Sequence, residues 1–173
     1  MPAYNAQKTL RKTYRDIPKH VADKIILVDD GSHDKTVSTA KRLGITTFVH
    51  PQNRGYGANQ KTCYTLALNE GAHVVVMIHP DYQYDSTLTE EIIRPILNRR
   101  FDIVLGSRIR TRQEALAGGM PLYKYIANRI LTTLENIVLG QNHSEYHTGF
   151  RAYHSRVLVN LPFHRFSDDF VFD

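Results

Sequence analysis

The sequence predicts an α/β fold with a mostly parallel sheet and helices on both faces. Short runs rich in β-branched residues alternate along the chain with segments whose apolar residues recur at helical spacing. Glycines follow three of these helical segments at the position where helices prefer to end, namely Gly44, Gly71 and Gly140. Because alternating β and α units form parallel strands joined by helices that cover the sheet, this order predicts the fold class.

Five helices are predicted, and the first and fourth have the clearest apolar faces. Leu10, Tyr14 and Ile17 lie on one face of the first helix, and a proline ends it. In the fourth, an amphipathic stripe runs along residues 88–97, while Pro121 opens the fifth. The predicted helices are residues 10–17, 34–43, 58–69, 88–97 and 121–139.

Four strands are predicted between these helices. Each is a short run rich in apolar residues, and residues 73–78 are the richest in β-branched side chains. The predicted strands are residues 24–28, 45–49, 73–78 and 101–105.

Length and composition are those of an ordinary globular domain. The chain has 173 residues, of which 42% are hydrophobic and 23% are charged. The single cysteine, Cys63, excludes an internal disulfide framework and favours a reducing compartment. No apolar run reaches the ~18 residues typical of a membrane span, and no charged-then-apolar leader opens the sequence. We expect a cytoplasmic protein, with peripheral association at the cytoplasmic membrane face left open.

The chain is basic, with a net charge of +5 and a pI near 9.3. Its basic residues are spread along the chain, and the tightest group is Arg108, Arg110 and Arg112. No motif of an RNA- or DNA-binding fold accompanies them, so we expect no nucleic-acid partner. The charge instead favours attraction to anionic substrates or to a membrane surface.

Polar clusters directly follow three of the predicted strands. In an open parallel sheet, ligands bind in the crevice outside the carboxyl ends of the strands, so the three clusters are expected to converge. Their carboxylates, amide and arginine suit a metal-bound ligand that carries phosphate. The clusters are Asp29-Asp30-Gly31-Ser32, His79-Pro80-Asp81-Tyr82-Gln83 and Gly106-Ser107-Arg108.

Four motifs resemble the family 2 glycosyltransferases, and most closely the dolichyl-phosphate mannose synthase branch. They are Pro2-Ala3-Tyr4-Asn5, Val28-Asp29-Asp30-Gly31-Ser32, Asp81-Tyr82-Gln83 and Thr148-Gly149-Phe150-Arg151-Ala152-Tyr153, in the family's order and at similar spacing. The resemblance implies a Rossmann-like fold of the GT-A type. It also implies an inverting hexosyltransferase that moves a sugar from a UDP- or GDP-sugar donor to a lipid-phosphate or glycan acceptor.

The same resemblance implies which residues hold the nucleotide. Asp30 matches a carboxylate that contacts the nucleobase or ribose, and Val28 supplies a backbone contact. Pro2 and Tyr4 match residues that cradle the base. The acidic residue that the family has after Tyr-Asn is absent, because Ala6 stands there. Charge-assisted hydrogen bonds from a ligand to a carboxylate belong to the strong class.

His79-Pro80-Asp81 stands where the family has its Asp-x-Asp motif, which clamps the diphosphate and a metal ion. We expect Asp81 and Gln83 to hold Mg²⁺ or Mn²⁺, and His79, Pro80 and Gln83 to lie against the donor. One carboxylate, the diphosphate and waters satisfy such an ion. For His79 three roles stay open: a ligand of Mn²⁺, a hydrogen bond to the diphosphate, or a strand-end histidine satisfied by backbone.

The expected catalytic residues are Asp81, Arg108, Glu145 and Asp169. Arg108 matches a position that touches the sugar nucleotide, and its guanidinium would stabilise the leaving diphosphate. A hydroxyl acceptor needs a general base, for which Glu145, Asp168 and Asp169 are candidates. A lipid phosphate is already anionic and needs none.

A glycine-containing turn precedes the third predicted helix, at Asn53-Arg54-Gly55-Tyr56-Gly57-Ala58. Two readings of this turn stay open. The helix N-terminus binds an anion, or the glycines serve packing alone.

The family begins with an apolar strand that leads into the Pro-x-Tyr-Asn turn, whereas this sequence opens at that turn and stops at Asp173. We therefore expect residues 1–173 to be a single catalytic domain that is incomplete at both ends, with a short natural variant as the alternative. A nucleotide-sugar-binding module without transferase activity is the alternative function. The sequence does not indicate an oligomeric state.

Overall fold

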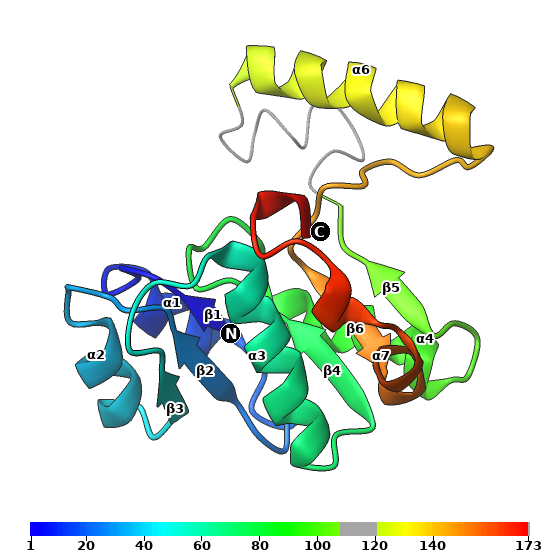
Figure 1. Cartoon of the computed structure of the whole chain (residues 1–173). Helices are drawn as coiled ribbons and strands as arrows, with labels where there is room; N and C mark the ends of the chain where they lie inside the picture. The colour runs from blue at the N-terminus through cyan, green and yellow to red at the C-terminus, as the bar shows by residue number, and fades with distance from the viewer. Residues whose placement is uncertain (108–120, 173) are drawn as a thin grey trace. The chain divides into compact units, whose positions relative to one another are not determined.

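The computed structural model describes residues 1–107 and 121–172. The chain divides into two compact units, each described here by itself (Figure 1). The first contains Met1–Leu105 and Gly149–Phe172, and it holds both sheets. The second contains Gly106–Thr148 and its long helix α6 (Leu122–Leu139).

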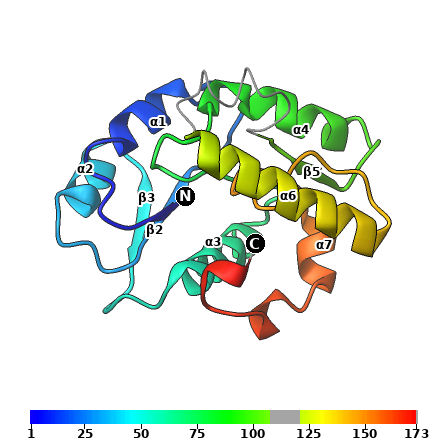
Figure 2. The same cartoon turned by 90° about the horizontal axis from the view of Figure 1, so that it is seen from above.

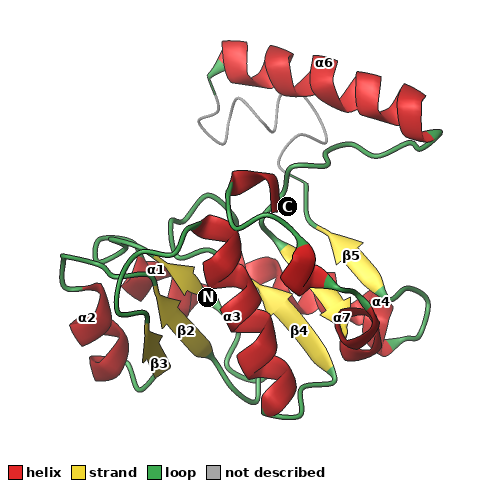
Figure 3. Cartoon of the chain, viewed as in Figure 1, coloured by secondary structure: helices red, strands yellow, loops and turns green. Residues whose placement is uncertain are grey.

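The first sheet contains three parallel strands in the order β1-β2-β3 (Figure 3). They are β1 (Pro2–Ala3), β2 (Ile26–Asp29) and β3 (Thr46–Val49). Predicted strands 24–28 and 45–49 correspond to β2 and β3. Pro2 and Ala3, which the sequence placed in a turn, pair with β2 as a short strand.

The second sheet has the order β4-β6-β5, and β6 runs antiparallel to both of its neighbours. Its strands are β4 (Val74–Met77), β5 (Ile103–Leu105) and β6 (Arg151–His154). β4 and β5 match predicted strands, whereas β6 was not predicted. Since both are antiparallel to β6, β4 and β5 run parallel to each other, and a mostly parallel α/β fold is confirmed.

The predicted helices are all present, with ends shifted by a few residues. Among the described residues, one further helix, α7, and three 3₁₀ turns, at Ser86–Leu88, Phe163–Arg165 and Phe170–Phe172, were not predicted. The glycines expected to end helices have positive φ, at +75° for Gly44, +77° for Gly71 and +61° for Gly140. The helices of the first unit are α1 (Leu10–Asp16), α2 (Thr36–Arg42), α3 (Tyr56–Asn69), α4 (Thr89–Leu97) and α7 (Ser155–Asn160).

Apolar side chains pack on both faces of the strands. Leu27 and Val28 are adjacent in β2, so they point to opposite faces, and both are fully buried. Leu27 joins a cluster with residues of α1, α2 and α4, while Val28 joins a cluster with residues of α3 and α7. Viewed from above, α1 and α4 lie on one side of the strands and α3 and α7 on the other (Figure 2). Helices therefore cover both faces, as predicted.

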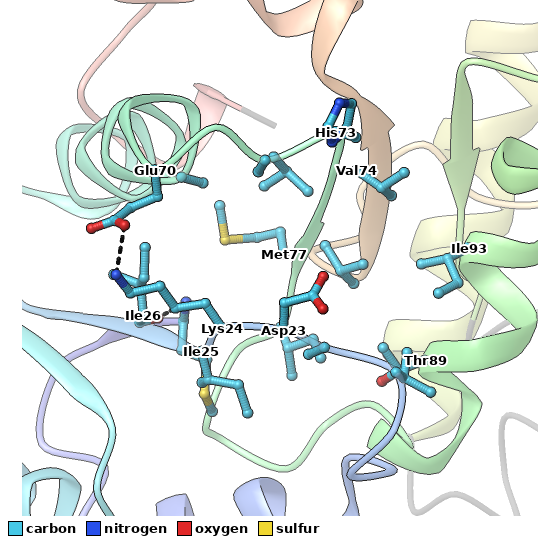
Figure 4. Close-up of a pocket in the computed structure, with 18 of the residues that line it drawn as sticks. Asp23, Lys24, Ile25, Ile26, Glu70, His73, Val74, Met77, Thr89 and Ile93 are labelled. Carbon is cyan, nitrogen blue, oxygen red and sulfur yellow. Dashed lines mark hydrogen bonds and ion pairs between the residues drawn. The ribbon is translucent and has the colours of Figure 1, made fainter.

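A cavity of about 390 Å³ lies between β2 and β4 (Figure 4). Its lining includes Met1, Ile26 and successive residues of β4 from Val74 to Met77. In the described part of the chain, β4 pairs with β6 and with no strand on its other edge. One edge of β4 therefore borders a largely apolar cavity.

Candidate functional site

The loops that follow β1, β2 and β4 are joined by hydrogen bonds at one edge of the first unit. The Asn5 N–H donates to Ser32 Oγ at 2.8 Å, and Asn5 Oδ1 accepts from the His33 N–H at 3.0 Å. Asn5 has φ +51°, a left-handed conformation in which asparagine is enriched. The Thr9 hydroxyl donates to the Pro80 carbonyl, which brings the loop after β4 to the same edge. We call the edge formed by these three loops the rim.

Asp34 strengthens this rim at the start of α2. Its carboxylate accepts from the Gln7 N–H at 3.0 Å and from the Thr36 N–H at 2.8 Å. Burial raises the pKa of Asp34, but the hydrogen bonds from Thr36 and Gln7 outweigh it and leave the pKa below its ordinary value. Asp34 therefore has a structural role at the start of α2.

Asp30 is buried and holds the turn that leads into α3. Its Oδ1 accepts from the Arg54 N–H at 2.9 Å and lies 2.7 Å from His50 Nδ1, and its Oδ2 accepts from the Gly55 N–H at 3.0 Å. His50 Nε2 in turn lies 3.0 Å from Thr62 Oγ1. The structure thus gives Asp30 a positioning role. The expected nucleotide contact of Asp30 stays a prediction.

The neighbouring residues of the nucleotide motifs differ in exposure. Asp29 is fully buried, and its Oδ2 accepts from the Ser32 N–H at 2.8 Å. Its Oδ1 has no hydrogen-bond partner among the described residues. Pro2 and Val28 are buried and paired in register, whereas Tyr4 is 50% exposed beside the rim. Of these four residues, Tyr4 has the side chain most accessible to a ligand.

Asp81 lies on an exposed turn that is fastened to α1. Its Oδ1 accepts from the Gln83 N–H at 3.0 Å. Tyr82 has φ +65°, and its hydroxyl donates to Asp16 Oδ2 at 2.6 Å. Lys12 Nζ lies 3.8 Å from the centroid of the same ring. These contacts hold the turn in place and leave the Asp81 carboxylate at the surface.

His79 is enclosed by a tyrosine ring and a glycine. Its ring stacks on that of Tyr56, with centroids 5.3 Å apart and planes 13° apart, and Tyr56 Oη lies 3.4 Å from Nε2. A Cβ on Gly149 would lie 2.7 Å from Cδ2 and 2.8 Å from Nε2 of His79. The Gly149 N–H donates to Tyr84 Oη at 2.8 Å, which fixes this close approach.

The N-terminus of α3 is capped by a protein carbonyl. Gly57 N and Ala58 N lie 2.7 and 3.3 Å from Asp168 O. A Cβ on Gly55 would lie 2.8 Å from the same carbonyl, and one on Gly57 would lie 2.5 Å from Ser167 O. In this structure the two glycines serve packing, which is the second of the two readings of this turn.

Two of the three candidate bases lie in the segment that packs on α3. Asp168 Oδ1 accepts from Lys61 Nζ at 2.8 Å. The hydrogen bond from Lys61 lowers the pKa of Asp168 and outweighs the effect of burial, and the positive charges of Lys61 and Arg54 lower it further. A lower pKa makes Asp168 a weaker base. Asp169 is exposed at the surface.

The second unit has its own polar network. Asn136 exchanges hydrogen bonds with the backbone of His143 at 2.8 and 2.9 Å and accepts from the Tyr146 hydroxyl at 2.8 Å. His147 Nε2 lies 2.9 Å from Glu135 Oε1. These bonds hold the segment after α6 against the polar face of that helix.

Of the remaining expected site residues, Glu145 belongs to the second unit and is buried, and Arg108 lies outside the described residues. Among the residues that the structure describes, no three His, Cys, Asp or Glu side chains form a metal-binding group. The edge of the first unit brings together the following expected residues: Tyr4, Asp30, His79, Pro80, Asp81 and Gln83. Sequence reasoning assigned no role to His50 or to Tyr56, although Tyr56 lies in the glycine-containing turn at residues 53–58.

The family described as Glycosyl transferase family 2 matches residues 1–161 of the chain. An uncharacterised protein of Methanocaldococcus jannaschii is 31% identical, over 88% of this chain and 62% of that protein. A UDP-N-acetylglucosamine–dolichyl-phosphate N-acetylglucosaminyltransferase of Methanococcus voltae is 29% identical, over 93% of this chain and 70% of that protein. The chain therefore spans about two thirds of the length of these relatives.

Solved structures with the same fold include glucosyl-3-phosphoglycerate synthase of Mycobacterium tuberculosis. One structure of it has a TM-score of 0.72 at 18% identity and covers 98% of this chain and 60% of that chain. Another, in complex with Mn²⁺, UDP-glucose and glycerol 3-phosphate, has a TM-score of 0.70 at 20% identity, over 98% of this chain and 59% of that chain. At these identities the likeness supports the fold alone, and it confirms the GT-A type. None of the helices in the described ranges has the length and apolar content needed to cross a bilayer.

Proposed function

Because the chain belongs to glycosyltransferase family 2, we propose that it transfers a sugar from a nucleotide-diphosphate donor to a lipid-phosphate or glycan acceptor. The reaction inverts the anomeric carbon and is assisted by Mg²⁺ or Mn²⁺. The observation that carries this proposal is the single rim formed by the loops after β1, β2 and β4, with the Asp81 carboxylate exposed on it. Such strand-end edges are where ligands bind in this class of sheet.

A UDP-sugar is the proposed donor, with a GDP-sugar as the second choice. Support comes from the Methanococcus voltae relative, whose name specifies UDP-N-acetylglucosamine. In this proposal the exposed Tyr4 ring packs on the base. Asp30 keeps the 54–55 turn in position and accepts a further hydrogen bond from the nucleoside, since each carboxylate oxygen has two acceptor sites.

The residues after β4 fit a divalent cation. Asp81 offers a surface carboxylate with one oxygen already oriented by the Gln83 N–H, and the exposed Gln83 amide lies two residues on. Mg²⁺ commonly takes one or two carboxylates together with substrate phosphates and water. When bound, the cation neutralises charge on the diphosphate as it leaves. Asp81 would hold it, with Gln83 as a second oxygen donor, and Arg108 would bind the diphosphate oxygens directly.

A lipid phosphate is the favoured acceptor because its oxygen is anionic and needs no general base. The net charge of +5 favours an anionic acceptor, and the Methanococcus voltae relative is named for dolichyl phosphate. Ile126, Ile130 and Ile137 on α6 are exposed and are suited to an apolar lipid. If the acceptor is a hydroxyl, the exposed Asp169 is a better base candidate than Asp168, whose carboxylate is paired with Lys61, and Glu145 stays a candidate.

Calorimetry and turnover test the proposal. The chain should bind UDP more tightly than GDP or ADP, and more tightly with Mn²⁺ or Mg²⁺ than in EDTA. The full-length protein should consume a UDP-sugar when dolichyl phosphate is added. Binding without turnover on any lipid-phosphate or glycan acceptor would support a nucleotide-sugar-binding module instead. Absence of nucleotide binding would contradict both functions.

A further inference from the structure

One side of α1 is basic. Leu10 and Ile17, seven residues apart, are buried in the same apolar cluster as Leu27 of β2, so this side of α1 packs on the sheet. On the opposite side, the three exposed residues of the helix are all basic, and a lysine four residues away in each flanking turn extends the row. We call these five residues the basic stripe: Lys8, Arg11, Lys12, Arg15 and Lys19.

The charges of the basic stripe are not neutralised within the protein. No member of the stripe forms an ion pair with any residue that the structure describes. Lys12 Nζ lies over the Tyr82 ring, a contact that brings no opposing charge. The single acidic residue within the stripe's stretch of sequence is Asp16, and its Oδ2 accepts from the Tyr82 hydroxyl. The stripe therefore presents positive charge to whatever lies outside α1.

α2 packs beside α1 and adds to this charge (Figure 2). Its exposed basic residues are Lys35, Lys41 and Arg42. Residues 7–42, which contain both helices, have nine Lys or Arg and five Asp or Glu, and so account for +4 of the net charge of +5. Although basic residues are spread along the whole sequence, most of the excess positive charge belongs to this part of the fold.

The basic stripe borders the rim. α1 directly follows the loop after β1, and the hydroxyl of Thr9, at its N-terminus, donates to the Pro80 carbonyl. At its other end, Asp16 Oδ2 accepts from the Tyr82 hydroxyl at 2.6 Å. The loop that carries Asp81 is thus fastened to both ends of α1. A surface that docks on the stripe would come close to the rim, where the Asp81 carboxylate is exposed.

From this arrangement we propose that the basic stripe docks the protein on an anionic lipid surface. The inference rests on the proposed function, in which the favoured acceptor is a lipid phosphate and therefore lies in a membrane. Clusters of roughly four to eight Lys and Arg residues on a helix are typical of segments that bind anionic lipids, because each cation is attracted by the negative surface potential. Docking brings the rim to the surface that presents the phosphate of the acceptor.

Nucleic acid is the other polyanion that a row of cations attracts. Two observations favour the lipid surface. The sequence has no motif of a nucleic-acid-binding fold, and the stripe borders the rim, where the lipid acceptor is expected to react. Nucleic acid is therefore included in the experiment as the competing partner.

Sedimentation with vesicles measures the docking. The full chain is mixed with vesicles of phosphatidylcholine alone, or of phosphatidylcholine with phosphatidylserine. We expect binding to the second kind only, and its loss as NaCl is raised to about 0.5 M, since salt screens exposed charges. Duplex RNA and duplex DNA at the same ionic strength should bind more weakly than the anionic vesicles, when compared per anionic group.

A triple substitution tests whether the stripe carries this binding. Arg11→Gln, Arg15→Gln and Lys19→Gln together remove three exposed charges, and Gln has a helix propensity close to that of Arg. Lys12 is kept because its side chain packs on Tyr82. Affinity for the anionic vesicles should fall by about tenfold or more, since each basic residue near such a surface contributes roughly fivefold.

The matched control removes the same charge from exposed positions outside α1 and α2. It combines Arg99→Gln, Arg100→Gln and Arg165→Gln, and it should lower the affinity for anionic vesicles by less than about threefold, because charges more distant than a Debye length are screened. UDP affinity, measured by calorimetry without vesicles, should stay within about threefold of the wild type in both triple variants.

Four results would overturn the inference and leave the proposed function standing, provided that the wild type binds UDP. They are absence of vesicle binding, equal binding to both kinds of vesicle, equal losses in the two triple variants, and tighter binding of nucleic acid that the stripe variant loses. If the wild type docks on anionic vesicles through the stripe but binds no nucleoside diphosphate, the lipid-binding surface is confirmed and the proposed function is wrong.

Discussion

Nδ1 of His50 lies 2.7 Å from Oδ1 of Asp30, and both side chains are buried. Because an ionised carboxylate only accepts hydrogen bonds, this contact and those from the Arg54 and Gly55 N–H groups leave Asp30 with three protein donors. The pair joins Asp30, which follows β2, to His50, which follows β3. Through the hydrogen bonds of Asp30 it is also joined to the turn at the start of α3. The position of Tyr56, the first residue of that helix, depends on this arrangement.

The first prediction concerns Asp30. In Asp30→Asn the new amide nitrogen cannot accept, so at least one of these three hydrogen bonds is lost, and the free energy of unfolding should fall by about 1–3 kcal/mol. Urea unfolding measures the change, with Asp23→Asn as an exposed charge control. Affinity for UDP should also fall in the folded variant. Unchanged stability together with weaker UDP binding would mean that the ligand contact, and not the turn, is the main role of Asp30.

The elements that could be predicted from sequence are those whose pattern is local. α4 carries its apolar face within nine residues, and β4 contains three consecutive β-branched valines. β6 was missed because Arg151–His154 has basic or titratable residues at both ends. Its strand character comes from β4 and β5, which pair with it on both edges and belong to distant parts of the chain.

The candidate site likewise contains some residues that a local sequence pattern predicts and others that it does not. Asp30 and Asp81 could be named as candidates because Asp30 directly follows β2 and Asp81 lies in the loop after β4, and strand ends converge at one edge. The roles of His50 and Tyr56 could not, because their partners are set by tertiary contacts. Lys61 and Asp168 are 107 positions apart in the sequence, so no local pattern predicts their ion pair. The capping of α3 by the Asp168 carbonyl is likewise a contact between distant residues. The two closely spaced glycines, Gly55 and Gly57, were the one feature of the sequence that marked the tightly packed turn before α3.

The second prediction concerns pH and Asp168. Its pKa in the folded state is lowered, so its ion pair with Lys61 stabilises the fold above the ordinary value of 3.8, and this contribution is lost as pH falls through the lowered value. Asp168→Asn should therefore show a flatter loss of stability below about pH 4 than the wild type. Urea unfolding at a series of pH values measures it, with Asp169→Asn as the neighbouring control. Parallel curves for Asp168→Asn and the wild type would count against the pair.

The third prediction concerns Asp81. Mn²⁺ or Mg²⁺ should tighten UDP binding to the wild type, and Asp81→Asn should reduce that gain by about tenfold or more, since even outer-shell partners of a metal contribute ~10–100-fold. Calorimetry with and without the cation measures the gain. Asp85→Asn is the control, because Asp85 is exposed on the same loop and its side chain accepts from the Thr87 N–H. An equal gain in Asp81→Asn and the wild type would exclude Asp81 as the ligand.

The last prediction concerns the edge of β4 that borders the cavity. The Ser155 N–H donates to the His73 carbonyl at 2.8 Å, so in the antiparallel ladder with β6 the hydrogen-bonded positions alternate from His73 to Val75 and Met77. The N–H groups of Val74 and Val76 then point to the other edge, where the cavity lies.

We expect Val74 and Val76 amides to exchange with deuterium at least about tenfold faster than those of Val75 and Met77, because a bonded core amide exchanges only on larger openings. Hydrogen exchange followed by NMR resolves the four residues. The amides of β6, which has a strand on each side, serve as the protected control. Uniform protection along β4 would mean that its second edge is also paired in solution, and that the cavity is filled by an extended segment.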